Sequence, residues 1–382
     1  MVGLETEPEV TAAFRRAHEL GEVGIQVAAY LDGELILNAC SGIADRETGT
    51  PVVSDTLFPV FSVTKGVTAT ALHLQAERGL LDLRDPIIKH WPEYGRHGKE
   101  TTTIRDALSH RAGIPQMPPG CTPEHLADWN WMVRGIEEMT PIFPPNTANA
   151  YHVLIWGWII GEIVRRTDPQ HRPFAQFVRD EILRPLNIVD LYLGVPPSQK
   201  HRIAKLIGGN IPFDEDPHGT MPTTVFPGSD VHNLPIVQQC CDPGAGAICT
   251  AEAMARFFAM LANGGELGGV RQLSEARVRS FTEFRDNPHS PDKILPIPVW
   301  FGANGFWLGG EPGASSSLVG DSRNVIYSPG AGGSIAWADL DKRLAVAVCH
   351  NEMDAATKVD REHPFAAIVA VIHNIVAKKA SG

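Results

Sequence analysis

Segments that favour β-strands lie at both ends of this chain, and no other feature constrains its fold as strongly. Residues 23–44 predict two strands joined at Asp32-Gly33, a pair typical of a tight hairpin turn. Three further short, strand-forming segments separated by turn residues lie near the C-terminus: 324–327, 333–339 and 344–350. Helices are expected at residues 7–20 and 363–379. The simplest assembly is an antiparallel sheet built from both chain ends and flanked by terminal helices.

The middle of the chain differs from its ends. It contains helical stretches and long proline-rich connections, such as 115–122 and 141–149. With 382 residues, 43% of them hydrophobic, the chain is long enough for two packed domains. We therefore predict an α/β (α+β) protein with a mainly helical domain, residues 61–250, inserted into a discontinuous sheet domain, residues 1–60 and 251–382. An active site is expected in the cleft between them.

Charge and composition argue against several classes of function. The formal net charge is −11, and no cluster of Lys and Arg exceeds a pair, so neither nucleic acid nor a membrane is expected as a partner. The first ten residues lack the basic flank and apolar core of a signal peptide, and the apolar run 153–160 is too short to span a bilayer. The sequence does not indicate an oligomeric state.

The cysteine and histidine spacings predict neither disulfides nor a metal site. No C-x-x-C pair and no H-x-H or H-E-x-x-H pattern occurs among the six cysteines and 15 histidines. We expect a cytoplasmic protein with reduced thiols and with no metal or other cofactor.

Ser62-Val-Thr-Lys65 is the most informative motif for chemistry. It stands where a short apolar run turns into a helix predicted from Ser62 to about Glu77, with Gly79 as the residue after its end. A spacing of three residues places the hydroxyl and the amine on one helix face, about one turn apart. A desolvated, neutral lysine can take the serine proton and so create a nucleophile without a histidine.

The motif is short enough to arise by chance. A second copy, Ser290-Pro-Asp-Lys293, lies in a stretch rich in proline and aspartate that predicts a loop. The copy at Ser62 is favoured because it opens a helix.

Five segments, taken in order along the chain, resemble the serine hydrolases related to class C β-lactamases. This group includes penicillin-binding D,D-peptidases, family VIII carboxylesterases and related acyltransferases. The segments are Phe61-Ser-Val-Thr-Lys-Gly66, Gly79-Leu-Leu-Asp-Leu-Arg-Asp-Pro86, Thr103-Ile-Arg-Asp-Ala-Leu-Ser-His-Arg-Ala-Gly113, Tyr151-His-Val153 and Gly330-Ala-Gly-Gly-Ser334. The resemblance extends from about residue 20 to residue 376 and implies a β-lactamase-like fold.

The resemblance also implies roles for individual residues. Ser62 would be the acylated nucleophile, Lys65 the base or the group that polarises it, and Tyr151 the second proton-transfer residue. The backbone N–H groups of Ser62 and Ala331 would form the oxyanion hole. Because free Lys and Tyr have pKa values near 10, the pKa of one or both must be shifted at neutral pH.

Two departures from the family pattern bear on the substrate. Val153 stands where the family has an Asn that helps to orient a substrate amide. Ser328-Pro-Gly330 stands where the family has Lys-Thr-Gly or His-x-Gly, so no cation is available there for a substrate carboxylate. Both departures favour small-molecule esters or thioesters without a free carboxylate.

Further residues are candidates for substrate contact. His152 follows Tyr151, and Ser328 and Gly330 belong to the third-motif segment. Trp307, which follows Gly302 and Gly305, is a candidate for an acyl pocket. His152 could equally be a hydrogen-bonded core residue, Trp307 a plain strand aromatic and Tyr151 a core tyrosine. His110 is expected to be structural, bonding backbone near the turn that begins at Arg111.

The combined interpretation is a serine esterase, or an acyltransferase that forms esters, acting through a Ser62 acyl-enzyme. A β-lactamase or D-amino peptidase is the nearest alternative, and a non-catalytic binding protein with the same fold is the other. The absence of G-x-S-x-G in the sequence argues against an α/β-hydrolase.

Overall fold

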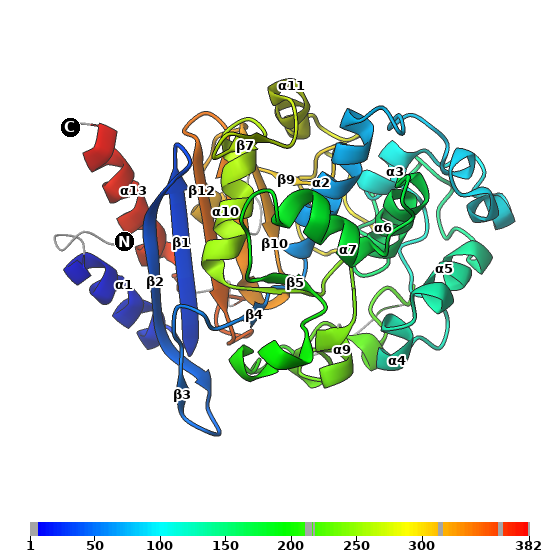
Figure 1. Ribbon diagram of the computed structural model, residues 1–382. Helices are drawn as coiled ribbons and strands as arrows, with labels where there is room; N and C mark the ends of the chain where they lie inside the picture. Colours follow the sequence, from blue (N-terminus) through cyan, green and yellow to red (C-terminus); the bar gives the residue numbers. More distant parts are fainter. Residues whose placement is uncertain (1–6, 211–215, 217, 312–315, 358–361, 381–382) are drawn as a thin grey trace.

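A seven-stranded antiparallel sheet joins the two ends of the chain (Figure 1). The computed structural model describes residues 7–210, 216, 218–311, 316–357 and 362–380. In spatial order the strands are β3 (Thr50–Pro51), β2 (Glu34–Asp45), β1 (Gly24–Leu31), β12 (Leu344–His350), β11 (Ile335–Asp339), β10 (Val325–Pro329) and β9 (Trp307–Leu308). Val27 of β1 pairs with Val348 of β12, at the centre of the sheet. The predicted antiparallel sheet is confirmed.

The hairpin between β1 and β2 has the turn that the sequence predicts. Asp32 and Gly33 have φ values of 52° and 82°, and a two-residue turn that matches strand twist needs positive φ at both positions. Seven of the eight residues of β1 and all seven of β12 are buried. The sheet is therefore covered on both faces here, which explains why these strands are continuous apolar runs.

Helices cover the two faces of the sheet. The terminal helices α1 (Glu7–Glu19) and α13 (Ala366–Ala380) pack against each other on one face, and α10 (Ala251–Ala262) lies on the other (Figure 1). Thr250 caps α10 by accepting a hydrogen bond from the N–H of Ala253 at 3.1 Å. The predicted terminal helices are confirmed, with the second beginning three residues later than expected.

The middle of the chain forms the helical part beside α10 (Figure 1). Its helices are α2 (Thr64–Glu77), α3 (Ile104–Leu108), α4 (Pro123–Leu126), α5 (Trp129–Glu138), α6 (Trp156–Thr167), α7 (Phe174–Val178), α8 (Ser229–His232) and α9 (Pro235–Gln239). Short helical turns are η1 (Ile87–Lys89), η2 (Pro92–Gly98), the π-helical η3 (Arg179–Leu183), η4 (Pro197–Arg202) and η5 (Thr223–Val225). A small sheet is formed by β4 (Phe58–Pro59), β6 (Ala247–Cys249) and β5 (Leu191–Leu193).

The connection between α10 and the last strands holds the remaining elements. They are β7 (Glu266–Leu267), β8 (Val270–Arg271), α11 (Glu275–Arg279), η6 (Ser280–Thr282) and α12 (Ser316–Val319), while the short turn η7 (Ala331–Gly333) connects β10 to β11. One continuous hydrophobic core extends from the sheet through the helical part. The division into two domains at residues 61 and 250 therefore stays a prediction.

Helix α2 is the buried axis of the helical part. Every residue from Thr64 to Ala76 is buried, and the helix packs against α6 and against β10 of the sheet. It ends at Glu77, as predicted, and Gly79 beyond its cap has a φ of 71°, the left-handed conformation that glycine adopts at low cost. This burial fixes the direction in which the first turn of α2 presents its side chains.

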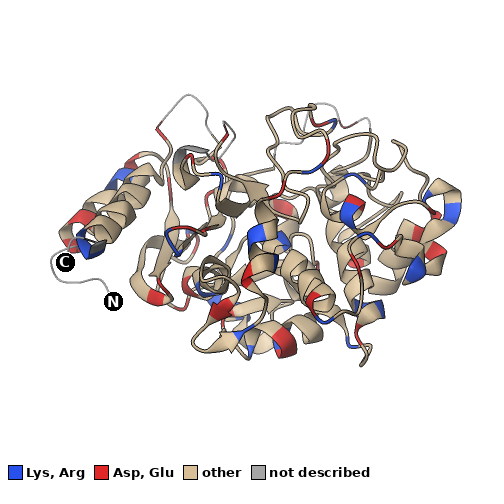
Figure 2. Ribbon diagram, turned by 90° about the horizontal axis from the view of Figure 1, so that it is seen from above, with Lys and Arg blue, Asp and Glu red and all other residues tan. Residues whose placement is uncertain are grey.

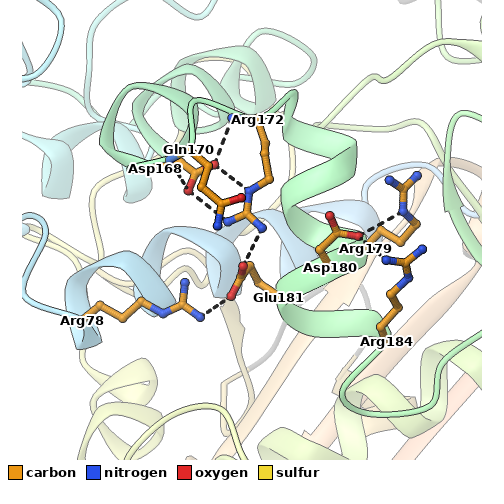
Figure 3. Close-up of polar contacts among 8 residues, drawn as sticks. All are labelled: Arg78, Asp168, Gln170, Arg172, Arg179, Asp180, Glu181 and Arg184. Carbon is orange, nitrogen blue, oxygen red and sulfur yellow. Dashed lines mark hydrogen bonds and ion pairs between the residues drawn. The ribbon is translucent and has the colours of Figure 1, made fainter.

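An ion-pair network fixes the far end of α2 (Figure 3). Arg78 donates to Glu181 at 2.5 Å, and Arg172 donates to the other oxygen of Glu181 at 2.6 Å. Arg172 also binds both oxygens of Asp168, at 2.8 and 3.0 Å. The network thus connects α2, the loop between α6 and α7, and η3.

Acidic and basic positions are interspersed along the chain (Figure 2). Within the described ranges, no helix combines the length and the apolar character needed to cross a bilayer. All six cysteines are free thiols, as predicted.

Candidate active site

Ser62 lies in a tight turn directly before α2. Phe61 has a φ of 49°, a conformation that residues other than glycine rarely adopt. The turn closes through the N–H groups of Thr64 and Lys65, which donate to the carbonyls of Phe61 and Ser62 at 3.0 Å each. The Thr64 hydroxyl locks it by donating to the Phe61 carbonyl at 2.5 Å and accepting from the Ala247 N–H at 2.9 Å. Surrounding structure thus holds a strained residue in place.

The helix begins two residues later than the sequence predicts. It starts at Thr64 and not at Ser62. The physical reason is the positive φ of Phe61, after which the chain first makes a turn of i→i+3 hydrogen bonds. Ser62 stays partly exposed, whereas Phe61 and Val63 are buried.

Lys65 uses its whole hydrogen-bonding capacity inside the protein. Its Nζ lies 2.9 Å from Ser62 Oγ, 2.8 Å from the carbonyl oxygen of Val153 and 3.0 Å from that of Gly244. Only 2% of the residue is exposed. Two of the three partners are carbonyls, which only accept, so the third direction is the single axis along which a proton can move.

Burial shapes the protonation of this amine. Desolvation lowers the pKa of Lys65 below its ordinary value, because a buried ammonium loses its hydration. A neutral Lys65 still donates to the two carbonyls and turns its lone pair toward the Ser62 hydroxyl. The geometry therefore suits a lysine that accepts the serine proton.

Asp242 is a buried carboxylate whose charge acts on the pKa of Lys65, and the sequence analysis missed it. One of its oxygens accepts from the N–H groups of Gly244 and Ala245 at 2.7 and 3.0 Å. Burial raises the pKa of Asp242, while these N–H groups and Lys65 limit the rise. Its charge in turn raises the pKa of Lys65 and opposes the effect of burial. The charge of Asp242 and the burial of Lys65 therefore shift the pKa of Lys65 in opposite directions.

A close approach of backbones brings Gly244 to the lysine. A Cβ on Gly157 of α6 would lie 2.0 Å from the Gly244 nitrogen, so only glycine fits there. In the sequence, Asp242-Pro-Gly244 leads into this approach, and Asp-Pro-Gly is typical of an Asx-type turn, so this pattern could have identified Asp242.

Tyr151 comes from the loop before α6 and meets the other two residues. Lys65 Nζ lies 5.5 Å from the centroid of its ring, and the ring packs against that of His110 at 4.2 Å. Burial raises the pKa of Tyr151 to about 12, although the facing side chains of Trp307 and Ser62 lower it. The structure thus brings Ser62, Lys65 and Tyr151 together, with a phenol that stays protonated at neutral pH.

The two N–H groups predicted for an oxyanion hole face no competing acceptor. Within the described part of the chain, neither the Ser62 N–H nor the Ala331 N–H donates a hydrogen bond. Gly330 packs directly on the segment before Ser62, because a Cβ at Gly330 would lie 2.4 Å from the carbonyl oxygen of Val60. Both N–H groups are therefore free to donate, and Gly330, next to Ala331, lies on the segment before Ser62.

The third motif lies at the end of β10. Ser328 is buried, and its Oγ would lie 3.2 Å from a Cβ on Gly66 of α2. Within β10, strand β9 pairs with Ile326 and Tyr327, so Pro329 lies beyond β9 and its missing N–H breaks no ladder on that side. The motif contributes a hydroxyl and backbone groups at this point and no cation.

His152 is bound to backbone through both ring nitrogens. Its Nδ1 lies 2.5 Å from the carbonyl of Ala150, and its Nε2 accepts from the Ile114 N–H at 3.2 Å. Burial lowers the pKa of His152 to about 4. This geometry favours a structural role and gives no support to the substrate contact expected for His152. His110 is also bound to backbone, accepting from the His152 N–H at 2.9 Å.

Trp307 is a strand residue that also packs on the site. It pairs with Tyr327 in the sheet, and its ring lies 5.6 Å from that of Tyr151. Two surface cavities of about 420 and 470 Å³ lie elsewhere, and none of Ser62, Lys65 and Tyr151 lines either one. The expected active-site cleft therefore stays a prediction.

The fold and the serine–lysine–tyrosine arrangement define a serine hydrolase. The beta-lactamase family model matches residues 10–371, and the chain belongs to this family.

Relatives in this family carry related names. The chain is 31% identical over 375 residues to Esterase/beta-lactamase LipL of Mycobacterium tuberculosis, covering 93% of this chain and 83% of that protein. A solved family VIII carboxylesterase is 27% identical with a TM-score of 0.86, covering 98% of this chain and 99% of that one. A penicillin-binding protein homolog from Caulobacter crescentus is 28% identical with a TM-score of 0.86 and the same coverage.

Proposed function

We propose that the protein is a serine esterase that acts through an acyl-enzyme on Ser62. The observation that carries this proposal is the position of Lys65, whose Nζ has carbonyls as two of its three partners and Ser62 Oγ as the third. The names of the esterase relatives support the substrate class.

Acylation begins when Ser62 Oγ attacks the ester carbonyl carbon. The hydroxyl proton passes to Lys65 as the new C–O bond forms, and the N–H groups of Ser62 and Ala331 stabilise the oxyanion. Tyr151, protonated because burial raises its pKa to about 12, gives its proton to the leaving alcohol as the ester bond breaks. Lys65 then returns a proton to Tyr151. A second alcohol or water attacks the acyl-enzyme by the reverse sequence, giving an ester or an acid.

We further infer that the site lies between the sheet part and the helical part of the chain. Ser62, Lys65 and Tyr151 belong to residues 61–250, whereas Ala331 and Trp307 come from residues 251–382. We propose a small-molecule ester or acyl donor as the partner and the cytoplasm as the compartment. The choice between water and an alcohol as acceptor depends on exclusion of water from the acyl-enzyme.

β-Lactam hydrolysis is the second candidate, because the relative at 31% identity is named both esterase and β-lactamase. Two features argue against it as the main activity. At position 153 a valine contacts Lys65 through its carbonyl, at 2.8 Å, and offers no side-chain amide. At position 328 a serine replaces the cation that a lactam carboxylate would meet.

The decisive experiment compares wild type with Ser62→Ala on a small aryl ester and on nitrocefin. Ser62→Ala should lower ester turnover by at least about a thousandfold. A fluorophosphonate probe should add its mass at Ser62 in wild type only. Ser62→Ala turnover within tenfold of wild type would refute the role, a silent Ser62 would favour a binding protein, and equal nitrocefin turnover would favour a β-lactamase.

A further inference from the structure

A loop from the C-terminal half of the chain forms hydrogen bonds with the segment that carries Tyr151. We call this loop, residues 285–295, the strap. The Asn149 side chain donates to the carbonyls of Asn287 and Ser290 at 2.8 and 3.2 Å, and the Lys293 N–H donates to the Asn149 carbonyl at 2.9 Å. The second S-x-x-K copy therefore has a structural place: Ser290 and Lys293 bind the tyrosine segment through backbone.

Asp292 anchors Tyr151 itself. Its Oδ1 accepts from the backbone N–H of Tyr151 at 3.0 Å, and also from those of Ile294 and Leu295 at 3.0 and 3.1 Å. No part of the Asp292 side chain is exposed. A carboxylate with three N–H donors on one oxygen holds the loop conformation strongly. Asp292 thus fixes the backbone from which the phenol extends.

Arg285 is the only cation that pairs with Asp292 in the described part of the chain. Its Nη2 lies 3.6 Å from Asp292 Oδ2, and its side chain is also wholly buried. Nη1 donates to the Ser109 carbonyl at 3.3 Å, whereas Nε, Nη2 and Asp292 Oδ2 have no hydrogen-bond partner among the described residues. A buried pair held so loosely contributes little to stability, because desolvation of both charges is not offset by hydrogen bonds.

The pair instead reaches the tyrosine at its backbone N–H and through the ring of Phe301. The Arg285 guanidinium lies 5.9 Å from the ring centroid of Phe301, whose ring packs edge-on against that of Tyr151 at 6.1 Å. The two charges act on the phenol in opposite directions: Arg285 lowers the pKa of Tyr151 and Asp292 raises it.

Three other titratable groups face Tyr151, namely Lys65 from α2, His110 from the loop after α3 and Tyr327 from β10. Burial lowers the pKa of His110 well below its ordinary value and raises that of Tyr327, so both are neutral between neutral and mildly alkaline pH. Apart from Lys65, Arg285 and Asp292 are therefore the charges that act on the phenol in this range.

We propose that the Arg285–Asp292 pair is a positioning device for Tyr151. Asp292 fixes the backbone that carries the phenol, and the negative charge of Asp292 balances the positive charge of Arg285. The phenol therefore stays protonated until it gives its proton to the leaving alcohol. This inference rests on the proposed esterase mechanism.

The first test is Asp292→Asn, which keeps an oxygen for the three N–H donors but removes the charge. With Arg285 unbalanced, the phenol should ionise more readily, and the alkaline limb of kcat/KM should move to lower pH by about one unit. Asp292→Ala also removes the oxygen that accepts from the Tyr151 N–H. At neutral pH it should lower kcat at least about tenfold more than Asp292→Asn does, while KM stays within twofold of wild type. Overlapping pH profiles for Asp292→Asn and wild type would overturn the proposal.

The second test does not depend on the folding of the Asp292 variants. Arg285→Gln keeps the Asp292 anchor and makes Tyr151 a weaker acid. The comparison uses two esters with the same acyl group, one with an alkyl and one with an aryl alcohol as leaving group. The alkyl alcohol needs protonation to leave, so kcat/KM should fall about tenfold more for the alkyl ester than for the aryl ester. An equal fall for both esters would show a merely structural role and overturn the proposal.

The matched control is Asp168→Asn, the same substitution in the buried pair with Arg172 (Figure 3). It should lower stability and leave both the pH profile and the leaving-group dependence unchanged. Fluorophosphonate labelling separates the two hypotheses: an unlabelled wild type defeats the esterase mechanism, whereas a labelled wild type with unshifted Asp292 and Arg285 variants defeats only this inference.

Discussion

Two buried lysines in this protein are bound in nearly the same way but differ in one partner. Lys65 at the start of α2 and Lys99 after η2 are 2% and 0% exposed, and each donates to three oxygens. For Lys99 all three belong to backbone carbonyls, those of Arg96, Glu137 and Met139. For Lys65 one is the hydroxyl of Ser62.

This difference decides whether the proton can move. Three carbonyls can only accept, so Lys99 keeps all its bonds only as an ammonium. A hydroxyl can also donate, so Lys65 keeps all its bonds when it is neutral. Burial lowers the pKa of both amines, to about 8 for Lys99. Desolvation alone therefore does not make a lysine a catalytic base. The lysine also needs a partner, here the Ser62 hydroxyl, that can donate a proton to it.

The largest effect is expected for Lys65→Met, which should lower kcat for an aryl ester by about a thousandfold, since it removes the proton acceptor. Its free energy of unfolding should fall by less than that of Lys99→Met, because two carbonyls lose a donor and not three. Steady-state kinetics and urea denaturation of both variants measure this. A Lys65→Met enzyme with a tenth or more of wild-type kcat would remove Lys65 from the mechanism.

Lys99→Met should show the opposite pattern. The loss of three donors to buried carbonyls should lower the free energy of unfolding by about 3 kcal/mol, while kcat per folded molecule stays within twofold of wild type. Denaturation monitored by fluorescence, together with active-site titration, gives both numbers. If ester turnover fell as far as in Lys65→Met, the contrast between the two lysines would be wrong.

The third prediction concerns pH. Lys65 must be neutral to accept a proton, so activity should rise with pH through its lowered pKa. Asp242→Asn keeps an oxygen for the N–H groups of Gly244 and Ala245 but removes the charge that raises the pKa of Lys65. The acid limb of kcat/KM should therefore move to lower pH by about one unit. A limb that moves to higher pH, or does not move, contradicts the coupling.

The smallest effect is expected for an exposed cation. Arg78 and Glu181 form an ion pair with 38% and 21% of their side chains exposed (Figure 3). Because water screens such a pair, Arg78→Met should lower the free energy of unfolding by about 0.5 kcal/mol and leave kcat unchanged. Thermal denaturation of Arg78→Met and of Lys99→Met provides the comparison. An equal loss of stability in both variants would mean that burial does not decide how much these two cations contribute.

Much of the fold follows from local patterns. The Asp32-Gly33 turn, the alternation of strands and turns near the C-terminus and Gly79 beyond the end of α2 predicted elements that the structure has within a few residues. The start of α2 was placed two residues early, because nothing in the sequence announces a positive φ at Phe61. The role of the second S-x-x-K copy was also beyond prediction, since it acts through backbone on a segment about 140 residues away.

The sequence by itself determined that a hydroxyl and an amine lie one turn apart, because a spacing of three residues fixes this geometry wherever the backbone turns helically. Only the tertiary structure decided which charges act on them. Asp242, Arg285 and Asp292 reach the site from distant parts of the chain, and the pKa values of Lys65 and Tyr151 depend on burial among them. Desolvation and electrostatic coupling arise from packing, and packing brings together residues that no local pattern relates.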